Sequence, residues 1–185
     1  MDAVAAAFAA YPRRGFLPRS ERGRAAYDGP IPIGGGQTNS QPRTVETMLR
    51  LLDVRPGDRV LDVGAGSGWT TALLTHLAGP SGRVVGVERM PELATWGSAN
   101  LRAAGVAADL RVATPGILGL PEEGPWDRIL VSAEASDVPA RLLDQLADPG
   151  RMVLPVGPHL TLVVRAGGHD EVTTHGLYRF VPLIP

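Results

Sequence analysis

The residues best suited to chemistry are a glycine-rich loop and an acidic residue that follows it. The segment VLDVGAGSGW leads from an apolar run into Gly64, Gly66 and Gly68, and a second apolar run, VVGVE, ends at Glu88. Glycines in such a loop let backbone N–H groups come close to a ligand. A carboxylate after the next strand can accept hydrogen bonds from ribose hydroxyls. The pair predicts a site for a ligand that contains a nucleoside.

The spacing of the glycines separates two classes of ligand. A dinucleotide site has the spacing G-x-G-x-x-G, whereas residues 64–68 have G-x-G-x-G and are followed by the bulky Trp69. A pyrophosphate at the start of a helix favours a small residue there. S-adenosylmethionine has no phosphate, so the loop favours it over a nucleotide cofactor and disfavours a nucleotide-dependent oxidoreductase. A glycine turn that binds nothing is the plain alternative, against which the placement of Glu88 argues.

The composition excludes several kinds of chemistry. All 18 basic residues are arginine, so no lysine can form a Schiff base or a P-loop contact, and there is no cysteine for a thiol nucleophile. The four histidines lack the spacing of metal ligands, and no metal site is predicted. A net charge of −1 without a long like-charge block argues against a nucleic-acid or membrane-surface role. Without a signal-peptide pattern or a membrane-spanning apolar run, a cytoplasmic protein is expected.

Alternating strands and helices must position the glycine loop. The expected strands are 59–63, 83–87, 110–112, 128–132 and 151–156, then 161–165 and 171–183 around a turn at Gly167-Gly168. The expected helices are 2–11, 44–52, 69–78, 91–104 and 139–146. This alternation predicts an α/β, Rossmann-like fold with a doubly wound, mostly parallel seven-stranded sheet and an antiparallel edge hairpin. Residues 1–185 are expected to form one domain, with an N-terminal helix and loop in 1–41 and the core in 42–185.

A long irregular stretch precedes the sheet. Residues 12–41 are rich in Gly, Pro, Arg and polar side chains, and include AYDGPIPIGGGQTNSQ. Such a stretch inside a domain is usually a functional loop or a disordered one. It ends near the hydroxyls of Thr38 and Ser40. Because Ser40 comes just before an expected helix, an N-cap role is the plain alternative for it. A serine-hydrolase reading is disfavoured, since no G-x-S-x-G elbow is present.

The same stretch resembles the signature of the protein-L-isoaspartate (D-aspartate) O-methyltransferase family. AYDGPIPIGGGQTNSQPRTVETM is similar to the family pattern AYxDxPLPIGxGQTISQPxxVAxM, and the resemblance extends over about residues 4–183. Further segments follow in the family's order: PRRGFLP, VLDVGAGSGW, GRVVGVE, GPWD, VPARLLDQL, RMVLPVG and RFVPL. The resemblance implies a class I methyltransferase that uses S-adenosylmethionine to methylate the free α-carboxylate of L-isoaspartyl residues in damaged proteins or peptides. The ester would start repair through a succinimide, and a monomer is expected.

The resemblance also implies which residues form the site. Thr38 and Ser40 would orient the substrate carboxylate, and Asp28 would contact the substrate backbone or hold the loop. A carboxylate is already ionised at pH 7, so no general base is expected. Ser132, at the end of the fourth strand of the sheet, would border the methionine end of the cofactor. The full set expected to bind the cofactor is Asp62, Gly64, Ala65, Gly66, Ser67, Gly68, Glu88, Arg89, Met90, Thr114, Pro115 and Ser132.

Departures from the family pattern leave two alternatives open. Asn39 stands where the pattern has an apolar residue, and one residue is missing before Asp28. The family's GDG, whose Asp is expected to contact the adenine amino group in relatives, is Thr114-Pro115-Gly116 here. Adenine binding would then depend on backbone groups and on packing by Arg89 and Met90. The alternatives are a carboxyl methyltransferase with a dedicated substrate and an S-adenosylmethionine-binding protein with impaired catalysis.

Overall fold

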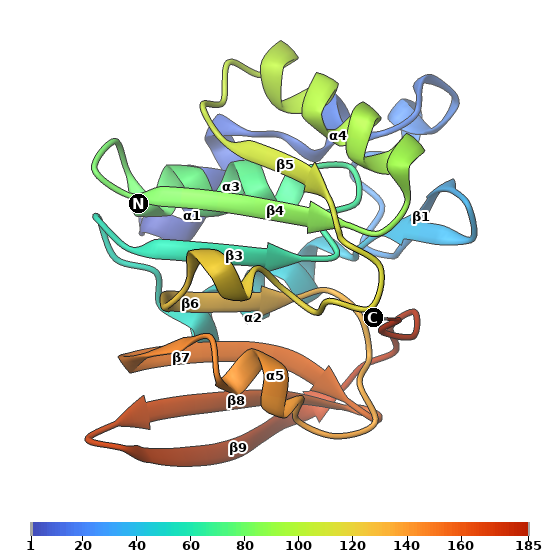
Figure 1. Ribbon diagram of the computed structural model, residues 1–185. Coiled ribbons are helices and arrows are strands. Elements are labelled where there is room, and N and C mark those ends of the chain that lie inside the picture. The colour runs from blue at the N-terminus through green and yellow to red at the C-terminus, as the bar shows by residue number, and fades with distance from the viewer. Residues whose placement is uncertain (1, 185) are drawn as a thin grey trace.

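A seven-stranded sheet lies at the centre of the computed structural model, which describes residues 2–184 (Figure 1). Its strands run in the order β5-β4-β3-β6-β7-β8-β9. Their bounds are β3 (Arg59–Val63), β4 (Arg83–Glu88), β5 (Asp109–Val112), β6 (Trp126–Val131), β7 (Leu146–Val156), β8 (His159–Ala166) and β9 (His169–Leu177). Neighbours from β5 to β7 pair in parallel, and β8 and β9 add two antiparallel pairs. The predicted doubly wound α/β sheet with an antiparallel edge hairpin is confirmed.

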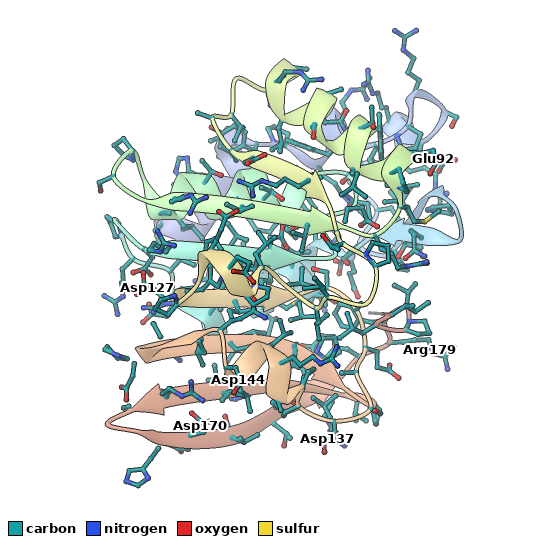
Figure 2. The ribbon with its side chains drawn as sticks, in the orientation of Figure 1. Glu92, Asp127, Asp137, Asp144, Asp170 and Arg179 are labelled. Carbon is teal, nitrogen blue, oxygen red and sulfur yellow. The ribbon has the colours of Figure 1, made fainter. Side chains whose placement is uncertain are left out.

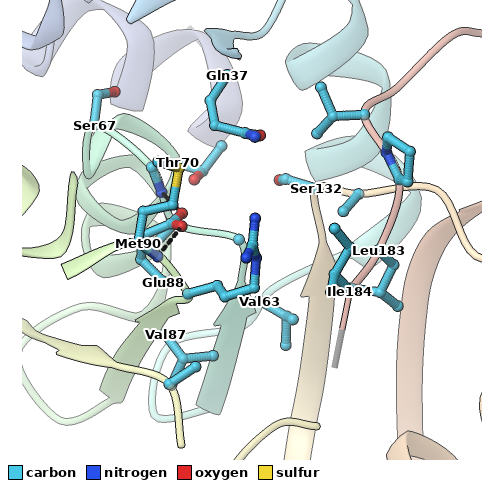
Figure 3. A pocket seen from close by; sticks show the side chains of 18 of the residues that line it. Gln37, Val63, Ser67, Thr70, Val87, Glu88, Met90, Ser132, Leu183 and Ile184 are labelled. Atoms are coloured by element: carbon cyan, nitrogen blue, oxygen red, sulfur yellow. Dashed lines mark hydrogen bonds between the residues drawn. The ribbon is translucent and has the colours of Figure 1, made fainter. Parts of the chain in front are cut away.

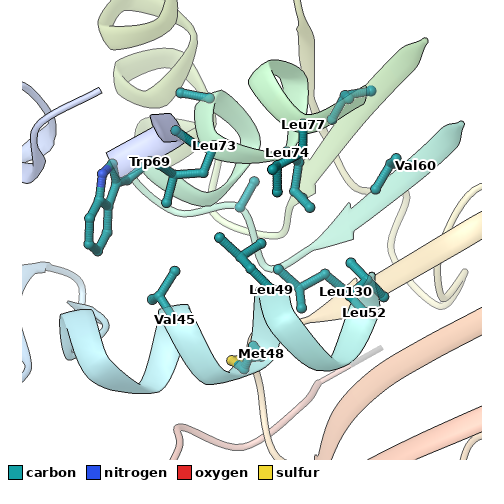
Figure 4. Close-up of a cluster of buried hydrophobic side chains, with 14 of the residues drawn as sticks. Val45, Met48, Leu49, Leu52, Val60, Trp69, Leu73, Leu74, Leu77 and Leu130 are labelled. Carbon is teal, nitrogen blue, oxygen red and sulfur yellow. The ribbon is translucent and has the colours of Figure 1, made fainter. Parts of the chain in front are cut away.

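Alternate side chains of the parallel strands fill two separate cores. Val60 and Leu130 pack on the face covered by α1 (Ala3–Ala10), α2 (Pro42–Leu52), α3 (Trp69–Ala78) and α4 (Pro91–Ala103). Figure 4 shows this core where α2 and α3 meet the sheet. Leu61 and Ile129 pack on the other face, with α5 (Ala140–Leu143) and the segment after β5. Successive strand residues point to opposite faces, so an apolar run is buried on both.

Charged side chains lie around the outside of the sheet and helices. Glu92, Asp137 and Arg179, for example, are exposed at the periphery (Figure 2). Within residues 2–184, no helix has both the length and the apolar character needed to cross a membrane.

The N-terminal stretch is more ordered than the sequence suggested. Residues 12–41 contain the 3-10 turns η1 (Arg13–Phe16) and η2 (Arg19–Arg24), followed by an antiparallel hairpin of β1 (Ile31–Gly34) and β2 (Gln37–Asn39). Gly34, Gly35 and Gly36 have φ of 101°, 58° and 74°, a run of left-handed conformations that glycine adopts without strain. The glycine run is therefore the turn of a hairpin, which the composition alone did not reveal.

Two expected elements differ in extent. The helix expected at 139–146 is the single turn α5, because β7 already begins at Leu146. The strand expected at 171–183 ends at Leu177, after a bulge around Gly176, whose φ is 69°. Beyond it the chain crosses to the loop after β6, where Glu134 N–H donates to the Val181 carbonyl at 2.7 Å. The prediction of a strand through residue 183 was therefore wrong.

Candidate active site

A pocket opens where the parallel strands end (Figure 3). Loops after β3, β4, β5 and β6 form one side, and the β1–β2 hairpin and the C-terminal residues 181–184 form the rest. Ligands of open α/β sheets bind at this edge, and the site lies where the fold predicts it.

The glycine loop and Glu88 are joined by backbone hydrogen bonds. Gly64, Gly66 and Gly68 have φ of 81°, 51° and 82°. The Glu88 carboxylate is buried, with Oε2 accepting from Gly66 N–H and Oε1 from Met90 N–H, both at 2.9 Å. Figure 3 shows the hydrogen bond between Glu88 and Met90. Two backbone donors thus fix the carboxylate against the loop. An ionised carboxylate has about four acceptor positions, so two remain for a ligand.

Asp62 and Gly68, which the sequence grouped with the cofactor ligands, lie outside the pocket wall. Asp62 is fully buried, and its Oδ2 accepts from the hydroxyls of Thr70 and Thr71 at 2.7 Å. Burial raises its pKa to about 6, although the two threonine hydrogen bonds act to lower it. A Cβ on Gly68 would lie 2.9 Å from the carbonyl oxygen of Gly97. Asp62 therefore supports the loop from behind, and the lack of a side chain at Gly68 lets the end of the loop pack closely against α4.

The segment after β5 gives the pocket a mostly apolar wall. Thr114 and Pro115, which the sequence grouped with the cofactor ligands, line it together with Ile117 and Leu118. Among the lining residues of this segment, Thr114 carries the only polar side chain. Arg89 and Met90 face the same pocket from the end of β4, while Ser132 and Ala133 line it at the end of β6.

The β1–β2 hairpin brings Thr38 and Ser40 to the pocket wall. The N-cap alternative for Ser40 is wrong, because Gln41 occupies that position. Asp28 lies near the start of α2 instead, where its Oδ1 accepts from Arg43 N–H at 3.2 Å. That backbone hydrogen bond is the main cause of the lowered pKa of Asp28. Asp28 does not line the pocket, and its observed contacts hold the loop.

Sequence reasoning missed the residue that holds the hairpin in place. Arg13 is buried and donates through Nη1 and Nη2 to the carbonyls of Tyr27, Gly29, Asn39 and Ser40 at 2.8–2.9 Å. Its Nε also donates to Asn39 Oδ1 at 2.6 Å. Burial lowers the pKa of Arg13 to about 10. The one signal was its place in the PRRGFLP segment, to which no role was given.

The C-terminal tail was also missed as part of the site. Val181 to Ile184 line the pocket, and Figure 3 shows Leu183 and Ile184 across from Glu88 and Met90. Leu183 N–H donates to the carbonyl of Glu134 at 2.7 Å, which fixes the tail beside the loop after β6. The RFVPL motif was a signal for these residues, but their apolar character was taken for a strand.

Comparisons of the sequence with known proteins identify one family. A family model described as Protein-L-isoaspartate(D-aspartate) O-methyltransferase matches residues 1–185. A protein-L-isoaspartate O-methyltransferase from Methanopyrus kandleri is 48% identical over 187 residues, covering 98% of this chain and 83% of the relative. One from Methanocella arvoryzae is 46% identical over 176 residues, covering 94% of each chain.

Solved structures share the whole fold. A protein-L-isoaspartate O-methyltransferase matches with a TM-score of 0.88 at 26% identity over 99% of this chain, which spans 61% of that protein's chain. A Plasmodium falciparum protein in complex with S-adenosyl-L-homocysteine has a TM-score of 0.86 at 24% identity, covering 99% of this chain and 90% of the other. The match over the full length and the relatives at 46–48% identity decide the family. This chain belongs to the protein-L-isoaspartate(D-aspartate) O-methyltransferase family.

Proposed function

We propose that this chain transfers a methyl group from S-adenosylmethionine to the free α-carboxylate of L-isoaspartyl residues in damaged proteins and peptides. One observation carries the proposal. The Glu88–glycine-loop site and the hairpin hydroxyls of Thr38 and Ser40 line a single pocket, in a chain of this family. Cofactor and substrate sites that share a pocket are what a direct methyl transfer requires.

The residues present fit S-adenosylmethionine better than a dinucleotide. Glu88 can accept from ribose hydroxyls, and backbone groups of the glycine loop can hold the amino-acid part. The first residue of α3, where a pyrophosphate would lie, is the bulky Trp69, which lines the pocket. Met90, Pro115 and Ile117 offer an apolar slot for the adenine ring. When bound, S-adenosylmethionine supplies a methyl group that its positively charged sulfur already activates.

The chain's own task is to align the substrate and exclude water. A carboxylate with a pKa near about 4 is ionised at neutral pH, so it attacks without a general base. The hydroxyls of Thr38 and Ser40 would donate hydrogen bonds that point one carboxylate oxygen at the methyl group. Leu183 and Ile184 on the tail, with Ile33 on the hairpin, provide apolar walls that limit water. Asp28, paired with Arg43, holds the loop and keeps its own negative charge away from the substrate.

The proposal is tested by radiolabelled methyl transfer to an isoaspartyl peptide, with the aspartyl peptide of the same sequence as control. We expect labelling of the isoaspartyl peptide and a base-labile methyl ester, with no labelling of the aspartyl peptide. Labelling of isoaspartyl peptides with unrelated sequences would separate general repair from a dedicated substrate. S-adenosylmethionine binding without transfer to any of these peptides would overturn the proposal in favour of an impaired enzyme.

Two finer expectations belong to the same proposal. We expect the chain to be monomeric and to act in the cytoplasm on protein substrates, without a nucleic-acid or membrane partner. The absence of cysteine and the net charge of −1 support this expectation. Light scattering coupled to size exclusion would measure the oligomeric state, and cell fractionation the location.

A further inference from the structure

The side chain of Asn39 bridges the hairpin and the glycine loop. Its Oδ1 accepts from Arg13 Nε at 2.6 Å, and its Nδ2 donates to Ser67 Oγ at 2.9 Å. Asn39 is 5% exposed and Ser67 is 3% exposed, so neither bond is exchanged freely with water. A buried amide whose oxygen and nitrogen are both hydrogen-bonded holds its neighbours in one arrangement, because breaking either bond leaves a polar group without that partner.

On the hairpin side, this bridge sets where the substrate hydroxyls point. Asn39 lies between Thr38, its neighbour in β2, and Ser40, which directly follows the strand, and all three residues line the pocket. Fixing the backbone at Asn39 therefore also fixes the backbone from which both neighbouring hydroxyls project. A slip by one residue would turn the hydroxyls away from their present face.

On the other side, the bridge ends on the segment that forms the floor of the cofactor site. Ser67 follows Gly66, whose N–H donates to Glu88, and the Ser67 carbonyl accepts from Asn100 Nδ2 at 3.0 Å. Ser67 and Asn39 both line the pocket. A ligand that restrains residues 64–68 will therefore restrain Ser67, and through it Asn39.

We propose that Asn39 is a positioning residue that couples the two halves of the site, so that binding of the S-adenosyl ligand strengthens binding of the isoaspartyl substrate. The inference rests on the proposed function and deepens it. An amide suits this task because it accepts from Arg13 and donates to Ser67 at once. An apolar side chain of similar size would remove the acceptor of Arg13 Nε–H and the donor to the Ser67 hydroxyl at the same time. Binding free energies are reciprocal, so the substrate must strengthen cofactor binding by the same factor.

The test measures peptide binding with and without saturating S-adenosylhomocysteine, by calorimetry, in four proteins. These are the unmodified chain, Asn39→Leu, Ser67→Ala and the matched control Ser98→Ala. Ser98 carries a half-buried hydroxyl that donates to the Leu110 carbonyl outside the pocket. We expect S-adenosylhomocysteine to tighten peptide binding at least fivefold in the unmodified chain and in Ser98→Ala. In the two bridge variants this ratio should fall below twofold.

The ratio separates coupling from a general structural role. A merely structural Asn39 would weaken both ligands and leave the ratio unchanged, and that result would overturn the proposal. The double variant should lose no more coupling than either single one, because both cut the same bridge. If Asn39→Leu does not fold, Ser67→Ala decides the question. If the unmodified chain transfers methyl groups but binds the peptide equally well with and without S-adenosylhomocysteine, the coupling proposal is overturned and the proposed function stands. If the unmodified chain neither binds the peptide nor transfers methyl groups to it, both the coupling proposal and the proposed function are overturned.

Discussion

The two halves of the pocket are built in different ways. The proposed cofactor side, residues 64–68 and Glu88, grows directly from two neighbouring parallel strands, and backbone N–H groups donate hydrogen bonds to the Glu88 carboxylate. The proposed substrate side, the hairpin and residues 181–184, depends on Arg13 and on contacts between distant segments. The cofactor side is thus built into the edge of the sheet, while the substrate side is fixed to it by polar contacts between distant segments and by apolar side chains such as Ile31 and Leu183. Single substitutions should therefore affect the two sides differently.

The largest effect expected from this contrast is on stability. Arg13→Leu should lower the free energy of unfolding by about 4 kcal/mol, because several charge-assisted hydrogen bonds are lost and buried carbonyls stay unpaired. Urea unfolding measures this loss. Exposed Arg14, whose side chain donates only to the Arg22 carbonyl, provides the control: Arg14→Leu should change stability by less than about 0.5 kcal/mol. Equal effects of the two substitutions would show that Arg13 does not hold the hairpin.

On the cofactor side, the buried carboxyl of Asp62 predicts a dependence of stability on pH. Its pKa is raised from 3.8 to about 6 by burial, so the folded state favours the protonated form. Ionisation therefore costs stability as pH rises from about 4 to above 6, up to about 3 kcal/mol for a shift of this size. Asp62→Asn removes this cost. The difference in unfolding free energy between the variant and the parent should rise in favour of the variant over that range. A difference that stays flat with pH would contradict the prediction.

Ser40 tests whether the substrate side can be disabled while the cofactor side stays intact. Ser40→Asp puts a negative charge beside the substrate carboxylate, so methyl transfer should fall about 100-fold or more while S-adenosylhomocysteine affinity changes little. Ser40→Ala should lower turnover severalfold through loss of alignment. Ser136→Asp adds the same charge at an exposed position outside the pocket wall and should retain parental turnover. Parental rates in Ser40→Asp would place the substrate elsewhere.

Glu88 tests whether the cofactor side of the pocket can be weakened by a single substitution. Glu88→Ala should weaken S-adenosylhomocysteine binding by about 1–3 kcal/mol, because charge-assisted hydrogen bonds to the ribose are lost. Calorimetry measures the affinity directly. Glu92, exposed on the first turn of α4, gives the matched control, and Glu92→Ala should bind as the parent does. Unchanged affinity in Glu88→Ala would mean that the cofactor lies differently in the pocket.

The smallest expected effect concerns Pro115, which follows β5 and stands where the family pattern has an aspartate. Pro115→Asp should tighten binding of S-adenosylhomocysteine by about 1 kcal/mol, since it adds an acceptor for the adenine amino group to a wall whose only polar side chain is Thr114. Pro115→Ala separates this gain from the loss of the proline ring. Weaker binding by a well-folded Pro115→Asp variant would show that this wall does not contact the adenine amino group.

Local sequence was enough to predict much of this protein. The alternation of strands and helices indicated the sheet, and the GAGSG loop and Glu88 indicated the pocket edge where the structure places them. These features can be predicted because they arise in consecutive strand–loop–helix units, in which side-chain periodicity and the need for positive φ at glycine leave a recognisable sequence pattern. The family motif around Thr38 and Ser40 added the substrate side, without showing how it is held.

Only the tertiary structure decided that Arg13 holds the hairpin, that Asn39 reaches Ser67, and that residues 181–184 close the pocket. It also showed that Ser40 is not a helix cap and that Asp62 lies behind the loop. These facts depend on contacts between residues up to 28 positions apart, and further for the tail. Such contacts leave no periodic pattern in the chain, because a buried polar group takes whichever partner the packed fold brings within hydrogen-bonding distance.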